Sequence, residues 1–334
     1  MISRVAENAF WLARYLERVE GMSRMLYVNI NFVLDVNLEG VPRWYPLVLA
    51  VGAEKEFRAR TKEADRDDAE TVQQFLCWDQ DQPASIASAL DNARDNARTI
   101  RETISLEMWE SLNGLSLWFN GPEGRKRYQR ERIEFYQYLR DQCALFQGFA
   151  LDTMLQSEAY HFMRLGTSLE RAGHTARMLD VKYHALGPTG RSIEWPREIA
   201  QWQAILRSCC AIEPYFKVAQ GDLSGPRVAE FLLFEKEFPH SVTRSLDQAN
   251  KFLKLVRPRG SSADRSAKAL ADLRSQLDAI SMEEVMQRGL HKTLSWIVDS
   301  VAGICSAVQE EYFLAPTQVR RHRTEPKRKL SRTA

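Results

Sequence analysis

Apolar residues recur along this chain at steps of three and four, the spacing of one face of an α-helix. The first such stretch covers residues 2–36, where Val5, Leu12, Leu16 and Val19 follow this spacing. We find no convincing run of alternating apolar and polar residues, the pattern typical of a half-buried strand. The hydrophobic pattern therefore predicts an all-α protein that begins with one long helix.

The same spacing predicts further helices, separated by glycine, proline and polar breaks. They fit about residues 85–113, 127–147, 151–186, 197–219, 226–234, 239–256, 264–278 and 281–313. The segment "NGPEGRK" (120–126) is expected to form a loop, and residues 257–266 a linker.

Two pairs of segments repeat along the chain in the same order. "LERVEGMSRML" (16–26) and "LERAGHTARML" (169–179) are identical at six of eleven positions, and residues 72–91 align without a gap with residues 228–247. Matching segments in the same order at similar offsets, 153 and 156 residues, indicate an internal duplication. We therefore predict a multi-helix bundle of two pseudo-equivalent halves, about 1–150 and 151–316, packed around a pseudo-twofold axis.

Composition fits a single globular domain over residues 1–316. Of 334 residues, 44% are apolar and 27% charged, while glycine (16) and proline (12) are scarce, which favours helices. The five cysteines have no paired spacing, so we expect reduced thiols. The sequence has neither a secretory signal pattern nor an apolar run long enough to cross a membrane, and we expect a cytoplasmic protein with no membrane contact.

The positive charge is concentrated at the end of the chain. Residues 320–334 hold seven Lys and Arg and one Glu, a net charge of +6. Because the whole chain has a net charge of +2, residues 1–319 have a net charge of about −4. Residues 317–334 are expected to form a basic, disordered tail with few apolar residues. Because the body is acidic, a nucleic-acid partner is not expected beyond contacts that this tail could make.

The repeated string places acids and bases on helices that are apolar on nearly every side. The candidate binding residues there are Arg14, Glu17, Arg18, Arg24, Glu158, Arg164, Glu170, Arg171, His174 and Arg177. In one interpretation, Glu17 and Glu170 each hold an arginine of the other half and clamp the bundle. In the other, the same residues line a cleft that holds an anionic or amide-bearing ligand. The repeat loses its symmetry where Glu20–Gly21 corresponds to Gly173–His174.

A second candidate cluster lies in "LDNARDNARTIRETISLEMWESLN", where "DNAR" occurs twice in tandem. Its candidate binding residues are Arg94, Asn96, Arg98, Arg101 and Glu107. The arginines follow at steps of four and three and form a stripe, with aspartates nearby that can pair locally. A solvated, salt-bridged face and a binding surface both fit this pattern.

No metal site or cofactor is expected. Glu158 and His161 have the Glu-x-x-His spacing of di-iron bundles, but that site needs a second copy. The corresponding residues of the first half are Val5 and Asn8, which cannot supply it. The sequence contains neither a Ser/His/Asp grouping nor a phosphate-binding glycine loop.

Four segments together resemble the bacterial alpha-E domain family. They are "ENAFWLARYLERVEGMSRML", "DNARTIRETISLEMWESLN", "RLGTSLERAGHTARMLDVKYH" and "VAEFLLFEKEFPHSV". The resemblance covers about residues 1–315 and implies an all-helical domain. It also implies two partners, a circularly permuted ATP-grasp ligase and a transglutaminase-like cysteine peptidase. The family's Glu and Arg fall on Glu17, Arg18, Arg24, Glu170, Arg171 and Arg177.

Two functions follow as expectations. The first is an accessory, non-catalytic component of an ATP-grasp and transglutaminase-linked system that forms peptide or amide bonds. It would bind a partner protein, a peptide or an amino acid through a Glu/Arg-lined cleft. The alternative is an enzyme, a transferase or ligase component acting on an amino acid or peptide, with Glu17 or Glu170 as its base. A homo-oligomer is compatible with either function.

Overall fold

The computed structural model describes residues 3–35, 42–186, 195–219, 221, 223–256 and 265–314. Across these ranges the regular structure is helical and strands are absent, which confirms the all-α prediction. The α-helices are α1 (Ser3–Asp35), α2 (Tyr45–Ala50), α3 (Glu54–Arg60), α4 (Ala69–Gln73), α5 (Ile86–Thr99), α6 (Leu106–Asn120), α7 (Pro122–Arg130), α8 (Arg132–Thr153), α9 (Glu158–Leu186), α10 (Trp195–Ser208), α11 (Ile212–Ala219), α12 (Gly225–Phe234), α13 (Val242–Val256), α14 (Arg265–Ala279), α15 (Met282–Arg288) and α16 (Leu290–Val308). Short 3-10 or π turns cover Glu63–Asp65, Gln74–Trp78 and Gln309–Phe313.

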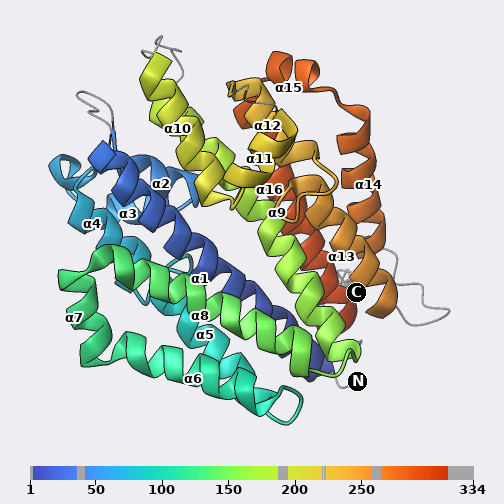
Figure 1. Cartoon of the computed structure of the whole chain (residues 1–334). Helices are drawn as coiled ribbons and strands as arrows, with labels where there is room; N and C mark the ends of the chain where they lie inside the picture. Colours follow the sequence, from blue (N-terminus) through green and yellow to red (C-terminus); the bar gives the residue numbers. More distant parts are fainter. Residues whose placement is uncertain are drawn as a thin grey trace, which may run out of the picture.

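Two long helices, α1 and α9, pack against each other through the middle of the molecule (Figure 1). Helix α1 also packs against α5 and α8, while α9 packs against α13 and α16. The short helices cross over, because α2 contacts α9 and α10 contacts α1. Each long helix is therefore surrounded by corresponding helices in the same chain order. This arrangement supports the two pseudo-equivalent halves, and their origin by duplication stays a prediction.

The aligned segments before α5 and α13 make the same local hydrogen bonds. Ser85 caps α5, accepting from the Ser88 amide at 3.1 Å and donating to the Asp79 carbonyl. Ser241 does the same before α13, accepting from the Arg244 amide at 3.0 Å and donating to the Glu235 carbonyl. A serine that caps a helix and also ties down the preceding turn fixes the angle at which the helix begins.

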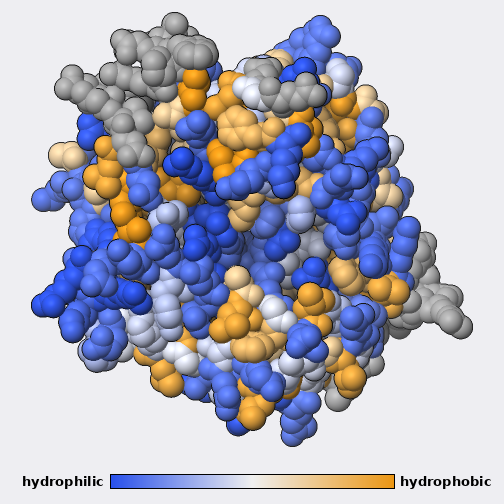
Figure 2. Space-filling model, in the orientation of Figure 1, coloured by the Kyte–Doolittle hydropathy of each residue, from blue (hydrophilic) through white to orange (hydrophobic). Residues whose placement is uncertain are grey.

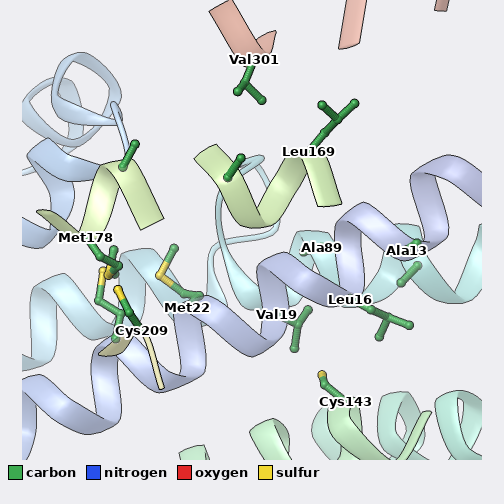
Figure 3. Packing of buried hydrophobic residues seen from close by; sticks show 14 of the residues in the cluster. Ala13, Leu16, Val19, Met22, Ala89, Cys143, Leu169, Met178, Cys209 and Val301 are labelled. Atoms are coloured by element: carbon green, nitrogen blue, oxygen red, sulfur yellow. The ribbon is translucent and has the colours of Figure 1, made fainter. Parts of the chain in front are cut away.

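Helix α1 is buried on several sides, as its sequence predicts. Leu12, Leu16 and Val19 are at most 2% exposed, and Met22 and Met25 are buried as well. Figure 3 shows Leu16 and Val19 of α1 above Cys143 of α8, while Leu169 of α9 extends toward Val301 of α16. Because apolar contacts surround both long helices, any charge placed at their contact is removed from water and needs a partner.

The predicted helix over 85–113 is wrong, because two helices meet there. Helix α5 ends at Thr99, and α6 begins after Ser105, whose hydroxyl accepts the Met108 amide at 3.3 Å. The buried side chains of Ile100 and Ile104 keep the connection in the core. An N-terminal cap inside a continuous apolar pattern therefore marks a real boundary.

Two other predicted boundaries are also wrong. The segment 120–126 is not a loop, because Pro122 begins α7 at the position where a missing amide hydrogen is no loss. The predicted helix over 281–313 is interrupted at Gly289, whose φ of 94° ends α15 before α16 begins.

The basic tail, residues 317–334, lies outside the described residues, as does most of the 257–266 linker. All five cysteines are described and are free thiols. Within the described ranges, no helix combines the length and apolar content needed to cross a bilayer. On the face drawn in Figure 2, hydrophilic residues cover the middle, and apolar residues form separate groups.

Candidate functional site

The first of two charged clusters at the α1–α9 contact contains Glu17. Its carboxylate is 3% exposed and accepts from Arg171 of α9, at 2.6 Å from Nε and 3.0 Å from Nη2. Gln147 of α8 donates to the same carboxylate at 3.0 Å. One turn further along α1, Glu20 pairs with Arg24. We call these five residues the Glu17 side.

The second cluster contains Glu170, which is 6% exposed on α9. Arg14 of α1 donates to one carboxylate oxygen at 2.9 Å from Nε and 2.7 Å from Nη2. Arg18 of α1 donates to the other oxygen at 2.9 Å and also reaches the Pro83 carbonyl at 3.2 Å. Arg177 lies near enough to act on the charge of Glu170. We call Glu170, Arg14, Arg18 and Arg177 the Glu170 side.

Each Glu-Arg dipeptide therefore exchanges ion pairs with the other. Glu17 of α1 forms an ion pair with Arg171 of α9, and Glu170 of α9 forms an ion pair with Arg18 of α1. Planar guanidinium groups suit this geometry because two parallel donors can meet one carboxylate. Desolvation offsets most of the attraction in such buried pairs, but removing one partner leaves a buried charge and costs about 3–5 kcal/mol. The exchange can therefore fix how the two helices meet.

The pairing also sets the ionisation of both glutamates. Burial alone would raise the pKa of Glu17, but the charge and hydrogen bonds of Arg171 hold it below its usual value. Burial likewise opposes ionisation of Glu170, and the charges of Arg18 and Arg14 outweigh it and lower its pKa strongly. Both carboxylates are therefore fully ionised near neutral pH.

The chain contains two Glu-Arg dipeptides, on α1 and α9, that pair with each other across the two helices. The family model that describes "a predicted alpha-helical domain with a conserved ER motif" matches residues 1–313. The chain belongs to the Alpha-E family. The crossed pairs at Glu17–Arg18 and Glu170–Arg171 give that dipeptide motif a structural role in this chain.

Similar sequences occur in mycobacteria. They include uncharacterized proteins Mb2597 of Mycobacterium bovis and MT2643 and Rv2567 of Mycobacterium tuberculosis. Each is 23% identical over 329 residues, which cover 92% of this chain and 36% of the relative. The chain thus spans about a third of the length of these relatives. No solved structure matches it significantly.

The two copies of the repeated string differ at the two positions noted in the sequence. Glu20 on α1 pairs with Arg24 four residues later, but Gly173 stands at the corresponding position before Arg177. A side-chain carbon on Gly173 would lie 3.2 Å from Arg177 Nη1, so this guanidinium folds back over the glycine. The ring of His174 fills the space beside Gly21 of α1, where an added carbon would lie 2.6 Å from it.

His174 and His240 are neutral in the folded protein. Loss of solvent lowers the pKa of His174 to about 4, and Arg177 and Arg24 add to this, while Glu17 and Glu170 oppose it. Loss of solvent also lowers the pKa of His240 to about 3, with Arg171 as the next cause. Neither ring adds charge to the two clusters at neutral pH.

The second predicted cluster lies elsewhere. Arg94 donates to Asn113 of α6 at 2.8 Å, and Asn96 donates to the Asn92 carbonyl. Arg98 forms an exposed pair with Asp95 at 3.1 Å, and Arg101 lies 5.3 Å from the Trp109 ring centre. Glu107 is exposed in the first turn of α6. These residues contact α5 and α6 rather than Glu17 or Glu170.

The two remaining predicted residues lie nearer the start of α9. Glu158 is in the first turn, and its charge acts on His161. Arg164 lines a cavity of about 20 Å³ with Gln147 and lies 5.8 Å from the Phe252 ring centre. Among the described residues, no group of three or more His, Cys, Asp and Glu side chains is placed to hold a metal ion.

Two members of the Glu17 side were not among the predicted site residues. Glu20 has a sequence signal, because it stands four residues before Arg24 on the same helix. Gln147 has none, since only the packing of α8 on α1 brings it to Glu17. Glu17 and Glu170 are at most 6% exposed and accept hydrogen bonds from arginines of the facing helix, so the carboxylates are packed and paired.

Proposed function

We propose that this chain is an accessory, non-catalytic component of a system that forms peptide or amide bonds. It would act beside a circularly permuted ATP-grasp ligase and a transglutaminase-like protein. The observation that carries the proposal is the length of the relatives. The match covers only 36% of each mycobacterial protein, so the matching region there is part of a longer chain. A domain built into larger chains is suited to act together with a second module.

The ion pairs at the α1–α9 contact support the non-catalytic part of the proposal. Glu17 and Glu170 are buried, and arginines on the facing helix hold their charges. Residues used in this way maintain the relative position of the two helices. In this proposal the two carboxylates stabilise the packing of the domain, and exposed residues bind the partner.

The alternative, an enzyme with Glu17 or Glu170 as its base, has less support. A general base works best when its pKa lies near the working pH. Ion pairing lowers the pKa of both glutamates, and their oxygens already accept hydrogen bonds from arginines. Taking up a proton would break these pairs inside the bundle.

The exposed arginines at the end of α5 are the surface that we assign to the partner. Arg98 in α5 and Arg101 just after it are exposed, and Glu107 is exposed in the first turn of α6. Such a surface can steer and orient an acidic partner without adding to the stability of the fold. It is also the part of the predicted Glu/Arg set that solvent reaches freely.

The proposal is tested by recovering partners from the source cells with a tagged full-length chain. We expect an ATP-grasp ligase and a transglutaminase-like protein to copurify in near-equal amounts, identified by mass spectrometry. Arg98→Glu should fold normally and recover much less of both, while Leu155→Glu, an exposed change after α8, should recover as much as the parent. Recovery of neither protein would contradict the proposal.

Activity of the chain alone tests the alternative. The purified chain with ATP and amino acids should show no product above a blank reaction. Product should form only when the copurified ligase is added. Turnover by the chain alone that Glu170→Gln abolishes would favour the enzyme instead, provided that the variant is shown to be folded.

A further inference from the structure

The two clusters at the α1–α9 contact differ in charge. On the Glu17 side, Glu17 and Glu20 balance Arg24 and Arg171. On the Glu170 side, a single carboxylate faces three guanidinium groups, those of Arg14, Arg18 and Arg177. Buried or half-buried charges of one sign are costly unless an opposite charge is near. The Glu170 side therefore has an excess of positive charge inside the bundle.

Arg177 is the group whose charge is least compensated. Among the described residues, no hydrogen bond or ion pair joins it to another side chain, although Glu170 attracts it from farther away. Burial lowers its pKa, and Arg18 and Arg14 lower it further, whereas the pKa of Arg24 and of Arg171 is raised by a carboxylate partner. Its counterpart on α1, Arg24, has the partner that Arg177 lacks.

A second polar group in the same place also lacks a partner. The Nε2 atom of His174 is buried and makes no hydrogen bond within the described residues. The charges of Glu17, Arg177 and Glu170 all act on this ring, with Glu17 the strongest, so it lies between the Glu17 side and the Glu170 side. Both side chains are half-buried, so part of each remains in contact with solvent. Buried polar atoms without partners are rare in folded proteins, and a water, an ion or a ligand group is one explanation for them.

We propose that the Glu170 side binds a carboxylate group, held by Arg177 and Arg18 with His174 as a further hydrogen-bond partner. The carboxylate takes the place that Glu20 occupies beside Arg24 in the other half. Arginine recognises carboxylates through two parallel donors, which favours this ligand over a spherical ion. A small organic acid and the free carboxyl end of a peptide both carry the group. The inference stands on the charge balance and not on the proposed function.

The test uses thermal unfolding of the full-length chain at pH 7.5, with acetate replacing chloride at constant ionic strength. A ligand that binds only the folded state raises the unfolding midpoint and saturates with concentration. We expect the midpoint to rise by several degrees in acetate. Equal midpoints in acetate and chloride at every concentration would overturn the proposal.

Two variants locate the effect. Arg177→Gln should abolish the response to acetate. Gly173→Glu supplies an internal carboxylate four residues before Arg177, so it should raise the midpoint in chloride and also abolish the response. If Gly173→Glu fails to fold because the Arg177 guanidinium cannot move aside, the acetate response of Arg177→Gln alone tests the assignment. An undiminished acetate response in Arg177→Gln would overturn the assignment.

The matched control is Gly148→Glu on α8, where an added side chain meets open space. It makes the same exchange of residues and adds the same charge, so it should retain the full response to acetate; a response lost there as well would overturn the assignment to Arg177. Acetate represents the small organic acid, and glycylglycine with its carboxylate-free counterpart glycinamide tests whether the carboxyl end of a peptide also binds. A response to glycylglycine and none to glycinamide supports binding of a peptide's carboxyl end, and equal responses to both would overturn carboxylate recognition.

Discussion

The Glu17 side and the Glu170 side come from similar strings but have different charge balances. Each places a glutamate of one long helix against an arginine of the other. Only the Glu17 side has a second carboxylate, because Glu20 on α1 corresponds to Gly173 on α9. The comparison teaches that a Glu-Arg dipeptide can clamp two helices in both halves, while one neighbouring position decides whether a charge is left for a ligand.

The largest expected effect is on the free energy of unfolding, and it should differ between the Glu170 side and the Glu17 side. Glu170→Gln leaves three arginines without a carboxylate, so it should lower the free energy of unfolding by about 3–5 kcal/mol. Glu17→Gln leaves Arg171 near Glu20, which still attracts it, and should cost distinctly less. Urea denaturation of both variants measures the difference. Equal losses would show that the charge balance of the two sides does not matter.

A smaller effect comes from pH. Loss of solvent and the nearby Arg177 and Arg24 lower the pKa of His174 from 6.5 to about 4, against the pull of Glu17 and Glu170. Between these values the unfolded chain binds a proton that the folded chain does not, so stability falls as the pH drops from about 6.5 toward 4. The loss at full effect is on the order of 3 kcal/mol.

His174→Gln checks this assignment, because it removes the titrating ring from the α1–α9 contact. Unfolding should be measured by urea between pH 5 and pH 7, above the range in which the carboxylates are protonated. The variant should show a shallower fall in stability than the parent. His240 contributes to the same window through its own lowered pKa, so some slope should remain. An unchanged slope would show that His174 titrates normally.

The smallest effect is expected on the exposed arginine stripe. Arg98 and Asp95 form an exposed pair, with 63% and 65% of their side chains accessible. Such pairs contribute about 0–1 kcal/mol, because water screens the charges. Arg98→Ala should therefore change the free energy of unfolding by less than about 0.5 kcal/mol. A loss as large as that of Glu17→Gln would mean that this stripe also holds the fold together.

Much of the fold could be predicted from the sequence, because helical spacing and repeated strings are local signals. The long first helix, the all-α class and the charged contact at Glu17 and Glu170 all follow from such patterns. The ends of some helices could not be predicted in this way. The cap at Ser105 and the positive φ at Gly289 interrupt apolar patterns that continue on both sides. The spacing of apolar residues does not change at those points.

The site was predictable only in part for a related reason. The sequence contains the charged residues of the α1–α9 contact and the break at Gly173, but pairing across helices depends on how the helices pack. Gln147 reaches Glu17 only because α8 lies against α1. The arginines of α5 have an equally dense pattern, yet their stripe faces solvent and α6. A charge pattern alone does not tell a buried helix contact from a solvated face.

The central claim is that the crossed Glu-Arg pairs hold α1 and α9 together, and a double-mutant cycle on Glu17 and Arg171 tests it most directly. Glu17→Gln, Arg171→Met and the double variant are compared with the parent by urea denaturation, with Glu17 and Arg98 as a distant control pair. We predict a coupling energy of about 2 kcal/mol for Glu17 with Arg171, and within about 0.5 kcal/mol of zero for the control. A Glu17–Arg171 coupling as small as the control would contradict the account.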